Sequence, residues 1–476
     1  MNVPSAVTAK PQDSLNLSTK LAYGVGELSS EVPNSIMVFF LLFFFTNVAG
    51  LNPGLAGTVL LIGKAWDGIN DPLVGWLSDR TRSRLGRRYP WMLWGAVPMG
   101  VCFALLWIVP PTQDQGLLML YYGAIAVIFY AAYTAVNLPH KILSAELTQT
   151  YHERTSLAGF KATFSISSSI FGLLLARLIF SLVPVGSQRY MLLGTIAGGI
   201  ACLAAYVCIW GTYRRFHAIQ SVRDQVQRPP TLPLGQQFRV ALQNRPFCLV
   251  VGIYLCSWMG VQVTAAILPY FVVNWMGLPD SHFTQMALAV QGTALAMMLV
   301  WSALGQRLGK KAIYCMGIPL TLLAQAGLFL VQPGQVGWMY GLAVMAGVGL
   351  ATAYLVPWSM LPDVVDLDEL QTGQRREGIF YSLVVQVQKI GIAIALFLVG
   401  KTLDWSGFIS STAGEPTPIQ PEQTLWAIRW LIGPIPSLVL IVGLVQAALY
   451  PLNRWVHDDI VLKLQERRLE WPPEKC

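Results

Sequence analysis

The sequence is poor in charged residues, which make up only 12% of its 476 positions, against about 25% in an average soluble protein. Hydrophobic residues reach 54%, and the mean hydropathy is +0.52. A soluble chain of this length needs a charged surface, whereas a protein whose outer wall faces lipid needs an apolar one. The composition therefore argues against a soluble protein and predicts one embedded in a bilayer.

Enzyme motifs are also absent. The sequence holds no intact Gly-x-x-x-x-Gly-Lys-Ser/Thr loop, no His-Glu-x-x-His motif and no predicted cytoplasmic domain large enough for ATP hydrolysis. The seven cysteines are odd in number and show no metal-ligand spacing, so we interpret them as packing residues. We therefore expect no enzymatic activity and no cofactor, with an ion gradient as the driving force.

The net charge of +8 could indicate a nucleic-acid partner, but most basic residues lie between hydrophobic segments, so none is expected. A cleavable signal peptide is not expected either, because the first twenty residues are polar and the first apolar stretch is long enough to stay in the membrane. That stretch is predicted to be the first transmembrane helix.

Apolar runs of about 20 residues, the length that crosses a bilayer, recur along the chain. Pro, Gly or charge clusters punctuate nearly every gap between them. The twelve predicted spans are 33–50, 55–77, 90–110, 117–139, 157–183, 190–212, 247–275, 283–304, 312–331, 336–358, 378–402 and 425–450.

The loops between the spans differ in basic charge. Lys and Arg gather in loops 78–89, 213–246 and 305–311, whereas the alternate loops contain one basic residue, Arg189. Because cytoplasmic loops are the basic ones, both termini are predicted to be cytoplasmic, in the inner (plasma) membrane of the cell. The long basic loop gives three parts: an N-terminal six-helix bundle at 1–212, a central cytoplasmic loop at 213–246, and a C-terminal six-helix bundle with a cytoplasmic tail at 247–476. This all-α layout is typical of a transporter with its substrate site between the halves.

A repeated loop supports the division into halves. Gly75-Trp-Leu-Ser-Asp79-Arg80 follows span 2 and ends in Gly86-Arg87-Arg88, and a degenerate copy, Ala303-Leu-Gly-Gln-Arg307-Leu-Gly309-Lys310-Lys311, follows span 8. The first copy resembles the signature loop of the major facilitator superfamily, where glycine permits close helix approach and the acid pairs with arginine to latch one conformer. We expect Gly75, Asp79, Arg80, Arg87 and Arg88 to form this latch.

Span 2 contains two carboxylates in its interior. Asp67 and Asp71 are four residues apart and share one face of a helix, with Asn70 close to that face. A charge at bilayer depth costs at least about 2.5–3.5 kcal/mol, and two adjacent carboxylates must take up a proton or share a cation. We interpret the pair as a coupling-ion site. The alternative is that Lys64 neutralises Asp67 in a structural ion pair.

Other intramembrane charges lie in spans 1, 5 and 11. Span 1 brings Glu27 and Glu31, of which Glu27 could lie at the cytoplasmic edge and Glu31 is the deeper. Lys161 in span 5 could snorkel to the membrane surface, but Lys389 lies near the middle of span 11. This distribution predicts that the N-terminal half binds the ion and that both halves clasp the substrate.

At these residues the chain resembles the glycoside-pentoside-hexuronide:cation symporter family, which includes the melibiose permease. The most specific pieces are Tyr23-Gly-Val-Gly26, Trp66-Asp67-Gly-Ile-Asn70-Asp71-Pro72 and Glu146-Leu-Thr-Gln-Thr-Tyr-His-Glu153-Arg154. The resemblance implies a cation site at Asp67, Asp71 and Thr134, to which we add Asn70. It implies that Glu31, Lys161 and Lys389 bind substrate, and we expect Tyr133 and Asn137 beside them.

The span-4 position is a departure from the family, since Asn137 stands where the family has an aspartate. A neutral amide can still bond a hydroxyl and two aspartates can still hold Na⁺, but with one acid fewer the site could equally serve H⁺.

The sequence suggests two classes of substrate. The Trp358-Ser-Met-Leu-Pro362-Asp363-Val-Val-Asp366 segment resembles the lysolipid-transporting branch of the same group, whereas Glu31 is an acceptor of the kind that sugar hydroxyls favour. We expect cation-coupled symport of a sugar or glycoside first and of a lysophospholipid second, by a protein that acts as a monomer among membrane lipids. A non-transporting scaffold or receptor is the alternative of a different class, but it would have no reason to keep midplane charges.

Overall fold

The computed structural model describes residues 15–148, 151–184, 186–223, 242–373, 376–412, 418–452 and 454–470. Within these ranges the regular structure is helical, apart from one isolated β-bridge between Ala49 and Thr412. The protein is therefore all-α, as its apolar runs predict.

The N-terminal half begins with a nearly continuous helical stretch, in which a π-helical turn joins two α-helical parts. Its elements are α1 (Leu17–Val25), α2 (Leu28–Ile36), the π-helical turn (Met37–Leu41), α3 (Leu42–Asn47), α4 (Pro53–Arg80), α5 (Tyr89–Leu105), α6 (Gln115–Leu147), α7 (Tyr151–Leu182) and α8 (Ser187–Arg223). The last of these continues to Arg223, beyond the end predicted at residue 212.

The C-terminal half repeats this plan and adds a final helix. Its elements are α10 (Arg245–Tyr270), a π-helical turn (Phe271–Trp275), α11 (Ser281–Leu308), α12 (Lys310–Leu330), α13 (Val336–Thr372), α14 (Glu377–Trp405), α15 (Glu422–Ile432), α16 (Pro434–Leu449) and α17 (Arg454–Glu470). Gly433 separates α15 from α16, so the twelfth predicted span consists of two helices.

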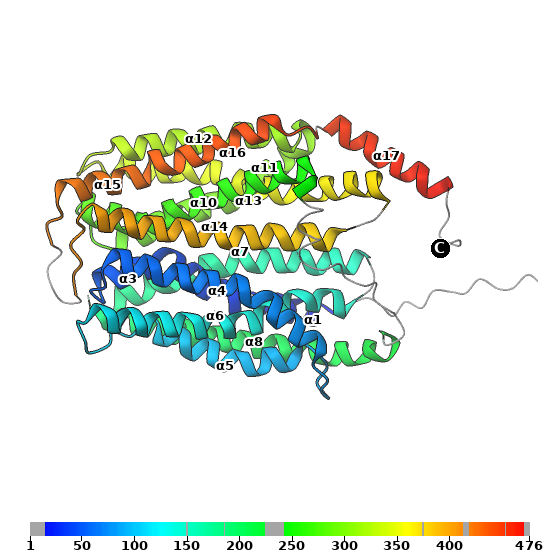
Figure 1. Cartoon of the computed structure of the whole chain (residues 1–476), viewed down its shortest axis with the longest axis horizontal. Coiled ribbons are helices and arrows are strands. Elements are labelled where there is room, and N and C mark those ends of the chain that lie inside the picture. The colour runs from blue at the N-terminus through cyan, green and yellow to red at the C-terminus, as the bar shows by residue number, and fades with distance from the viewer. Residues whose placement is uncertain are drawn as a thin grey trace, which may run out of the picture.

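Ten helical stretches among the described residues are long and apolar enough to cross a membrane, against twelve predicted spans. The other two predicted spans are α5, which has 17 residues, and α4, which carries Lys64, Asp67 and Asp71 in its interior. These charges lower the hydropathy of α4. Both helices nevertheless lie among the others in the bundle (Figure 1).

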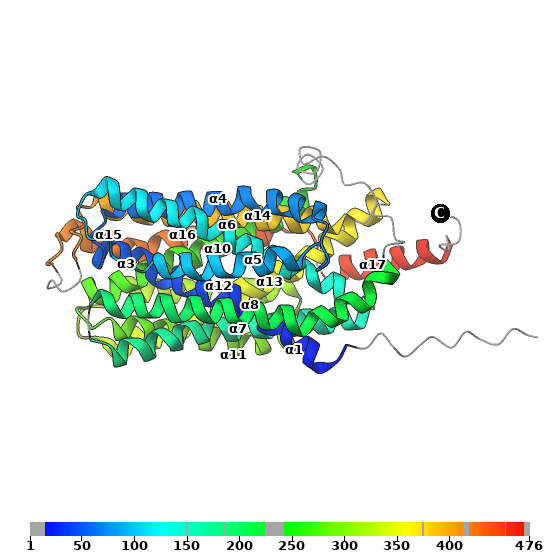
Figure 2. The same ribbon diagram turned by 90° about the horizontal axis from the view of Figure 1, so that it is seen from below.

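The helices form two layers with their axes roughly along the long direction of the molecule (Figure 1). Helices α1 to α8 make one layer and α10 to α16 the other, and α4 packs along α14 where the layers meet. The first described helix, α1, and the last, α17, lie at the same end, as Figure 2 also shows. We call this the terminal end.

The opposite end is held together by contacts between the halves, and we call it the closed end. The backbone N–H of Ser411 donates to the carbonyl of Thr46 at 3.1 Å, and its hydroxyl donates to the carbonyl of Asn47 at 3.2 Å. The hydroxyl of Ser410 donates to the carbonyl of Leu51 at 3.1 Å. The chain after α14 therefore forms a seam with the last residues of α3 and the loop that follows it.

Side chains reinforce this closed end. Arg189, in the first turn of α8, forms an ion pair with Asp280, just before α11. The hydroxyls of Thr46 and Tyr270 are 2.7 Å apart, and the rings of Phe43 and Tyr270 meet edge to face. The apolar core that contains these aromatic rings is shared by both halves.

Glycines let α4 and α14 approach closely near the closed end. A Cβ atom added to Gly400 would lie 2.6 Å from the carbonyl oxygen of Pro53 and 2.8 Å from the Cα of Gly57. Both neighbours are backbone atoms, so they can yield only if the helices move apart.

Gly400→Val should therefore open the closed end. Overpacking costs about 1–3 kcal/mol, which lowers the population of this conformer roughly 5- to 150-fold relative to an open one. The measurement is the rate at which a thiol reagent labels a Ser411→Cys reporter in a background without the native cysteines. Gly341→Val is the matched control, because a Cβ at Gly341 meets nothing within 4 Å. Equal labelling rates in both variants would contradict the prediction.

Candidate functional site

The two aspartates lie on α4, a helix with one proline in its first turn and another in its interior. Asn52 caps α4 by accepting the N–H of Gly54 at 2.9 Å, and Pro53 occupies the first turn. Pro72 lies inside the helix and has no N–H, so the carbonyl of Gly68 loses its usual donor. The free carbonyl of Gly68 lies between Asp67 and Asp71 in the sequence, so it adds a polar group to this part of an otherwise apolar helix.

Lys389 of α14 lies between the two aspartates. Its Nζ is 3.0 Å from Oδ1 of Asp67 and 2.7 Å from Oδ2 of Asp71. Thr134 of α6 donates its hydroxyl to the same Oδ1 of Asp67 at 3.1 Å, and both of these side chains are buried. The structure thus joins Asp67 directly to Thr134, and Asp71 to Asp67 through the ammonium group of Lys389.

This arrangement bears on one expectation and one alternative. Lys389 was expected on the substrate-binding wall, and that role stays a prediction. Its ammonium contacts both aspartates and supplies the neutralising charge that the alternative reading gave to Lys64. The ammonium of Lys64 instead lies over the ring of Tyr130, 4.9 Å from its centre. The sequence brings Lys64 close to Asp67 along the helix, yet the neighbouring helix α14 offers a nearer cation.

Asn70 does not join the aspartates either. Its amide donates to the backbone carbonyls of Tyr130 and Ala131 at 3.4 Å each, so it ties α4 to α6. Asn70 is buried and serves packing in this conformer.

A second charged cluster lies where α1 meets α2. Glu27 is 2% exposed, so its side chain is covered by protein, whereas the sequence left open a position at the cytoplasmic edge. Its Oε1 is 3.5 Å from Nδ1 of His140 and 3.9 Å from Nζ of Lys161. His140 also lies 2.9 Å from the carbonyl of Tyr23 through Nε2, and its ring stacks on the ring of Tyr23.

The sequence analysis missed His140. For Glu27 a signal was present, because Glu27 and Glu31 are four residues apart in the stretch just before the predicted span 33–50. The polar run before Pro33 obscured the start of that span, which the structure extends back to Leu17.

The expected substrate residues line up mainly on α2, α6 and α7. Glu31 is half-buried, and the positive charges that act on its carboxylate come from Lys141, Lys161 and Lys64. The structure therefore places Glu31 near Lys161, with Lys141 as an additional cation that the sequence analysis did not single out.

One face of α6 continues this surface. Tyr133, Asn137 and Lys141 follow one another at intervals of four residues and so form a stripe along the helix. Tyr133 is half-buried with its ring beside those of Phe129 and Tyr130. Asn137 is buried, and its Oδ1 has no hydrogen-bond partner among the described residues. That oxygen can accept a hydrogen bond from a bound solute.

At the terminal end, two of the expected latch residues meet. Nη2 of Arg88 is 2.5 Å from Oδ1 of Asp79, and Nε of Arg88 is 3.8 Å from Oε1 of Glu146. Nη1 of Arg88 donates a hydrogen bond to the hydroxyl of Ser78. The guanidinium of Arg80 instead lies over the ring of Trp76, 3.8 Å from its centre. Arg87 is half-buried in the loop between α4 and α5.

Gly75 is not in tight contact in this conformer. A Cβ atom added there would lie 3.6 Å from Leu138, an ordinary van der Waals distance. The expectation that Gly75 permits close helix approach is therefore not met here. On α4 it is Gly57 that lies against the backbone of another helix, at Phe397 and Gly400 of α14.

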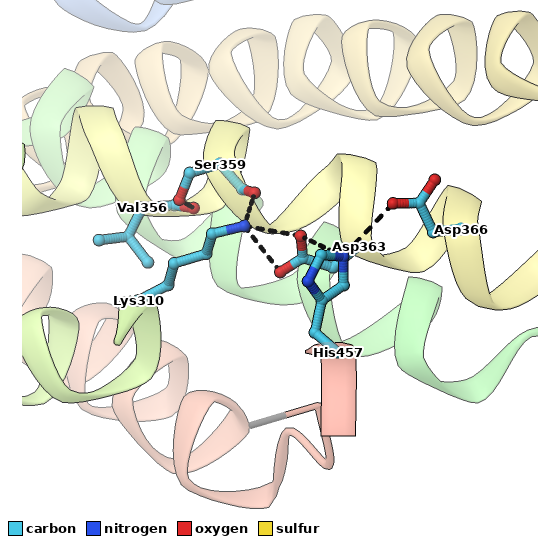
Figure 3. A network of polar contacts seen from close by, with 6 residues as sticks. All are labelled: Lys310, Val356, Ser359, Asp363, Asp366 and His457. Atoms are coloured by element: carbon cyan, nitrogen blue, oxygen red, sulfur yellow. Dashed lines mark hydrogen bonds and ion pairs between the residues drawn. The ribbon is translucent and has the colours of Figure 1, made fainter. Parts of the chain in front are cut away.

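The C-terminal half carries a corresponding polar network, shown in Figure 3. Lys310 contacts both carboxylate oxygens of Asp363, at 2.6 and 2.8 Å, and donates to the carbonyl of Ser359. His457 of α17 lies 3.4 Å from Asp363 and 3.3 Å from Asp366. This network fixes α17 to the ends of α12 and α13.

An apolar cavity lies inside the C-terminal half. Its lining comes mainly from α10, α11, α12 and α13, and Phe39 of the N-terminal half closes one side. The few polar side chains on its wall include Gln291, whose amide oxygen accepts a hydrogen bond from Tyr354 at 3.4 Å. The cavity can hold an apolar group but offers little to a charged one.

The described residues hold no group of three or more His, Cys, Asp or Glu side chains that could bind a metal ion. The six cysteines in the described ranges are free thiols, and Cys476 lies outside those ranges.

Comparisons with known proteins cover nearly the whole chain. A family model described as MFS/sugar transport protein matches residues 22–454. An uncharacterized symporter of Synechocystis sp. is 44% identical over 96% of this chain and 98% of its own length. A sphingosine-1-phosphate transporter of Xenopus tropicalis is 29% identical over 96% of this chain and 92% of its own.

Among solved structures, the crystal structure of a nucleoside transporter superposes with a TM-score of 0.63 over 92% of this chain and all of its own. The two sequences are 13% identical, so this match supports the fold alone.

Proposed function

Because the chain belongs to the MFS/sugar transport protein family, we propose that it is a symporter that couples the movement of a cation to that of an organic solute by alternating access. Membership makes it a multi-pass membrane transporter and not an enzyme. We further propose that it acts in the inner (plasma) membrane with the terminal end in the cytoplasm, because the basic loops 78–89 and 305–311 lie at that end.

The contact of Lys389 with Asp67 and Asp71 is the observation that carries the coupling proposal. The pair of carboxylates holds an ammonium ion supplied by the other half of the protein, and Thr134 adds a hydroxyl oxygen. Na⁺ or H⁺ arriving at this pair would replace the ammonium and release α4 from α14. Ion binding would thereby change the contact between the halves, which is the link that symport requires.

The expected sugar or glycoside remains the first candidate substrate. Glu31 and the unpartnered oxygen of Asn137 are acceptors for hydroxyl groups, and Lys161 is a donor. The family description, a sugar transport protein, is consistent with this proposal.

A lysophospholipid is the second candidate, and the apolar cavity favours it. Such a molecule has an apolar chain, for which the side chains that line the cavity offer apolar contacts, and a phosphate, which Lys64, Lys141 and Lys161 would attract. The similarity to a protein named as a sphingosine-1-phosphate transporter supports the same reading.

Uptake into proteoliposomes should separate these substrates. We expect labelled substrate to accumulate only when an inward Na⁺ or H⁺ gradient is imposed, since the ion contributes the driving force. The assay compares labelled glycosides with labelled lysophosphatidylcholine, each with and without Na⁺ and with and without a pH gradient. Accumulation that ignores both gradients would overturn the symport proposal.

A further inference from the structure

Two buried polar atoms face each other without a hydrogen-bond partner in the N-terminal half. Oε1 of Glu27 and Nδ1 of His140 are 3.5 Å apart, and neither makes a hydrogen bond within the described residues. Both side chains are almost completely buried. Buried polar atoms normally have a hydrogen-bond partner. A buried atom without one has lost its hydrogen bonds to water and gained none in the protein, which costs free energy.

The other nitrogen of His140 determines which charge faces Glu27. Nε2 lies 2.9 Å from the carbonyl oxygen of Tyr23, and a carbonyl can only accept, so Nε2 carries the hydrogen and donates it. In a neutral imidazole this leaves a lone pair on Nδ1, which faces the carboxylate. Two acceptors then oppose each other. One proton on either atom would turn this repulsion into a charge-assisted hydrogen bond.

Several charged or titratable groups surround the pair. Lys161 of α7 is the nearest cation, at 3.9 Å from Oε1 of Glu27, and Lys141 of α6 is the next. Glu31 of α2 also acts on Glu27, and the charge of Glu27 in turn acts on Tyr23 of α1 and Cys208 of α8. With Lys161 positively charged, Glu27 negatively charged and His140 neutral, these three side chains have no net charge. One added proton would therefore give them a single positive charge.

Lys161 also connects the site to its surroundings. Its side chain is 32% exposed, whereas those of Glu27 and His140 are buried. Lys161 was predicted to bind substrate, so a solute that attracts its ammonium would draw it away from Glu27. The carboxylate would then lose its only close cation among the described residues.

We propose that Glu27 and His140 form a proton-binding site, separate from the pair of aspartates on α4, and that it takes up one proton when substrate engages Lys161. The proton comes from solvent and is shared between Oε1 and Nδ1, and no other bond forms or breaks. The link to substrate depends on the proposed function, whereas proton binding itself does not.

Infrared difference spectra of the purified protein in lipid nanodiscs test the proton site without any substrate. Spectra are compared between about pH 5 and about pH 8, the range in which imidazoles and buried carboxyl groups titrate. Glu27→Gln should remove one carboxyl signal from the parent spectrum. Glu422→Gln and His282→Gln are the controls, since they remove an exposed carboxyl and a hydrogen-bonded histidine near the closed end.

A Glu27→Gln spectrum that loses no more than the Glu422→Gln spectrum would overturn the proposal. His140→Gln gives a second measurement if Glu27→Gln does not fold. Without the imidazole the Glu27 carboxyl should require about tenfold more protons for half-titration, a shift of one pH unit. An unchanged midpoint would equally overturn the site. Failure of substrate uptake alone would count against the proposed function and leave this result intact.

Discussion

Asp67→Asn and Asp71→Asn should each abolish ion-driven accumulation of substrate while leaving exchange down a gradient measurable. Asparagine keeps nearly the same shape but removes one of the two negative charges that hold the ammonium of Lys389. A hydrogen bond to a charged group contributes about 1.5–3 kcal/mol, so cation affinity should fall roughly 10- to 150-fold. Uptake against a gradient and counterflow of labelled substrate, measured in the same proteoliposomes, separate the two activities.

Asp404→Asn is the matched control for this prediction. Asp404 also lies on a spanning helix and pairs with a lysine, Lys401, at 3.7 Å, but it does so near the closed end. Its loss should leave accumulation near the parent level. If Asp404→Asn reduces accumulation as strongly as Asp71→Asn, the effect reflects general loss of acidic charge and the α4 pair is not the ion site.

Lys389→Gln should bind the coupling cation more tightly than the parent protein and yet transport substrate poorly. The ammonium of Lys389 occupies the space between Asp67 and Asp71, so its removal takes away an internal competitor and leaves two carboxylates that repel each other. The cation should then bind about tenfold or more tightly and release slowly. Isothermal titration of the purified protein with Na⁺, repeated at several pH values, measures this change.

Lys401→Gln provides the comparison, because Lys401 lies on the same helix, α14, and pairs with Asp404 outside the proposed site. Its cation affinity should match that of the parent. A Lys389→Gln variant with weaker cation binding would show that the ammonium supports the ion site instead of competing for it, and the coupling scheme would have to be rejected.

Much of the fold was predictable because hydropathy reports directly on bilayer depth. Ends of helices were less predictable. α8 continues to Arg223 and α13 to Thr372, well past the apolar runs, because a helix can extend into water where hydropathy no longer marks it. The division of the twelfth span at Gly433 left no gap in hydropathy, because the residues on both sides of it together form one apolar stretch, Glu422–Leu449.

The site was predictable only where its residues are close in sequence. The spacing of Asp67 and Asp71 places both on one face of a helix, and this indicates a shared ligand without further information. The ammonium group that lies between the two carboxylates belongs to Lys389, in the other half of the chain. Its contact with Asp71 therefore depends on how α14 packs against α4. His140 was invisible for the same reason, because only tertiary packing brings it to Glu27.

The seam at the closed end has an evolutionary consequence. Part of it is made by main-chain atoms, namely the bridge between Ala49 and Thr412 and the bond from the N–H of Ser411 to the carbonyl of Thr46. Main-chain groups are the same in every residue except proline, which lacks the N–H. These contacts can therefore survive sequence drift at Ala49 and Thr412, so homologous proteins can diverge there in side chains and still shut this face of the molecule in the same way.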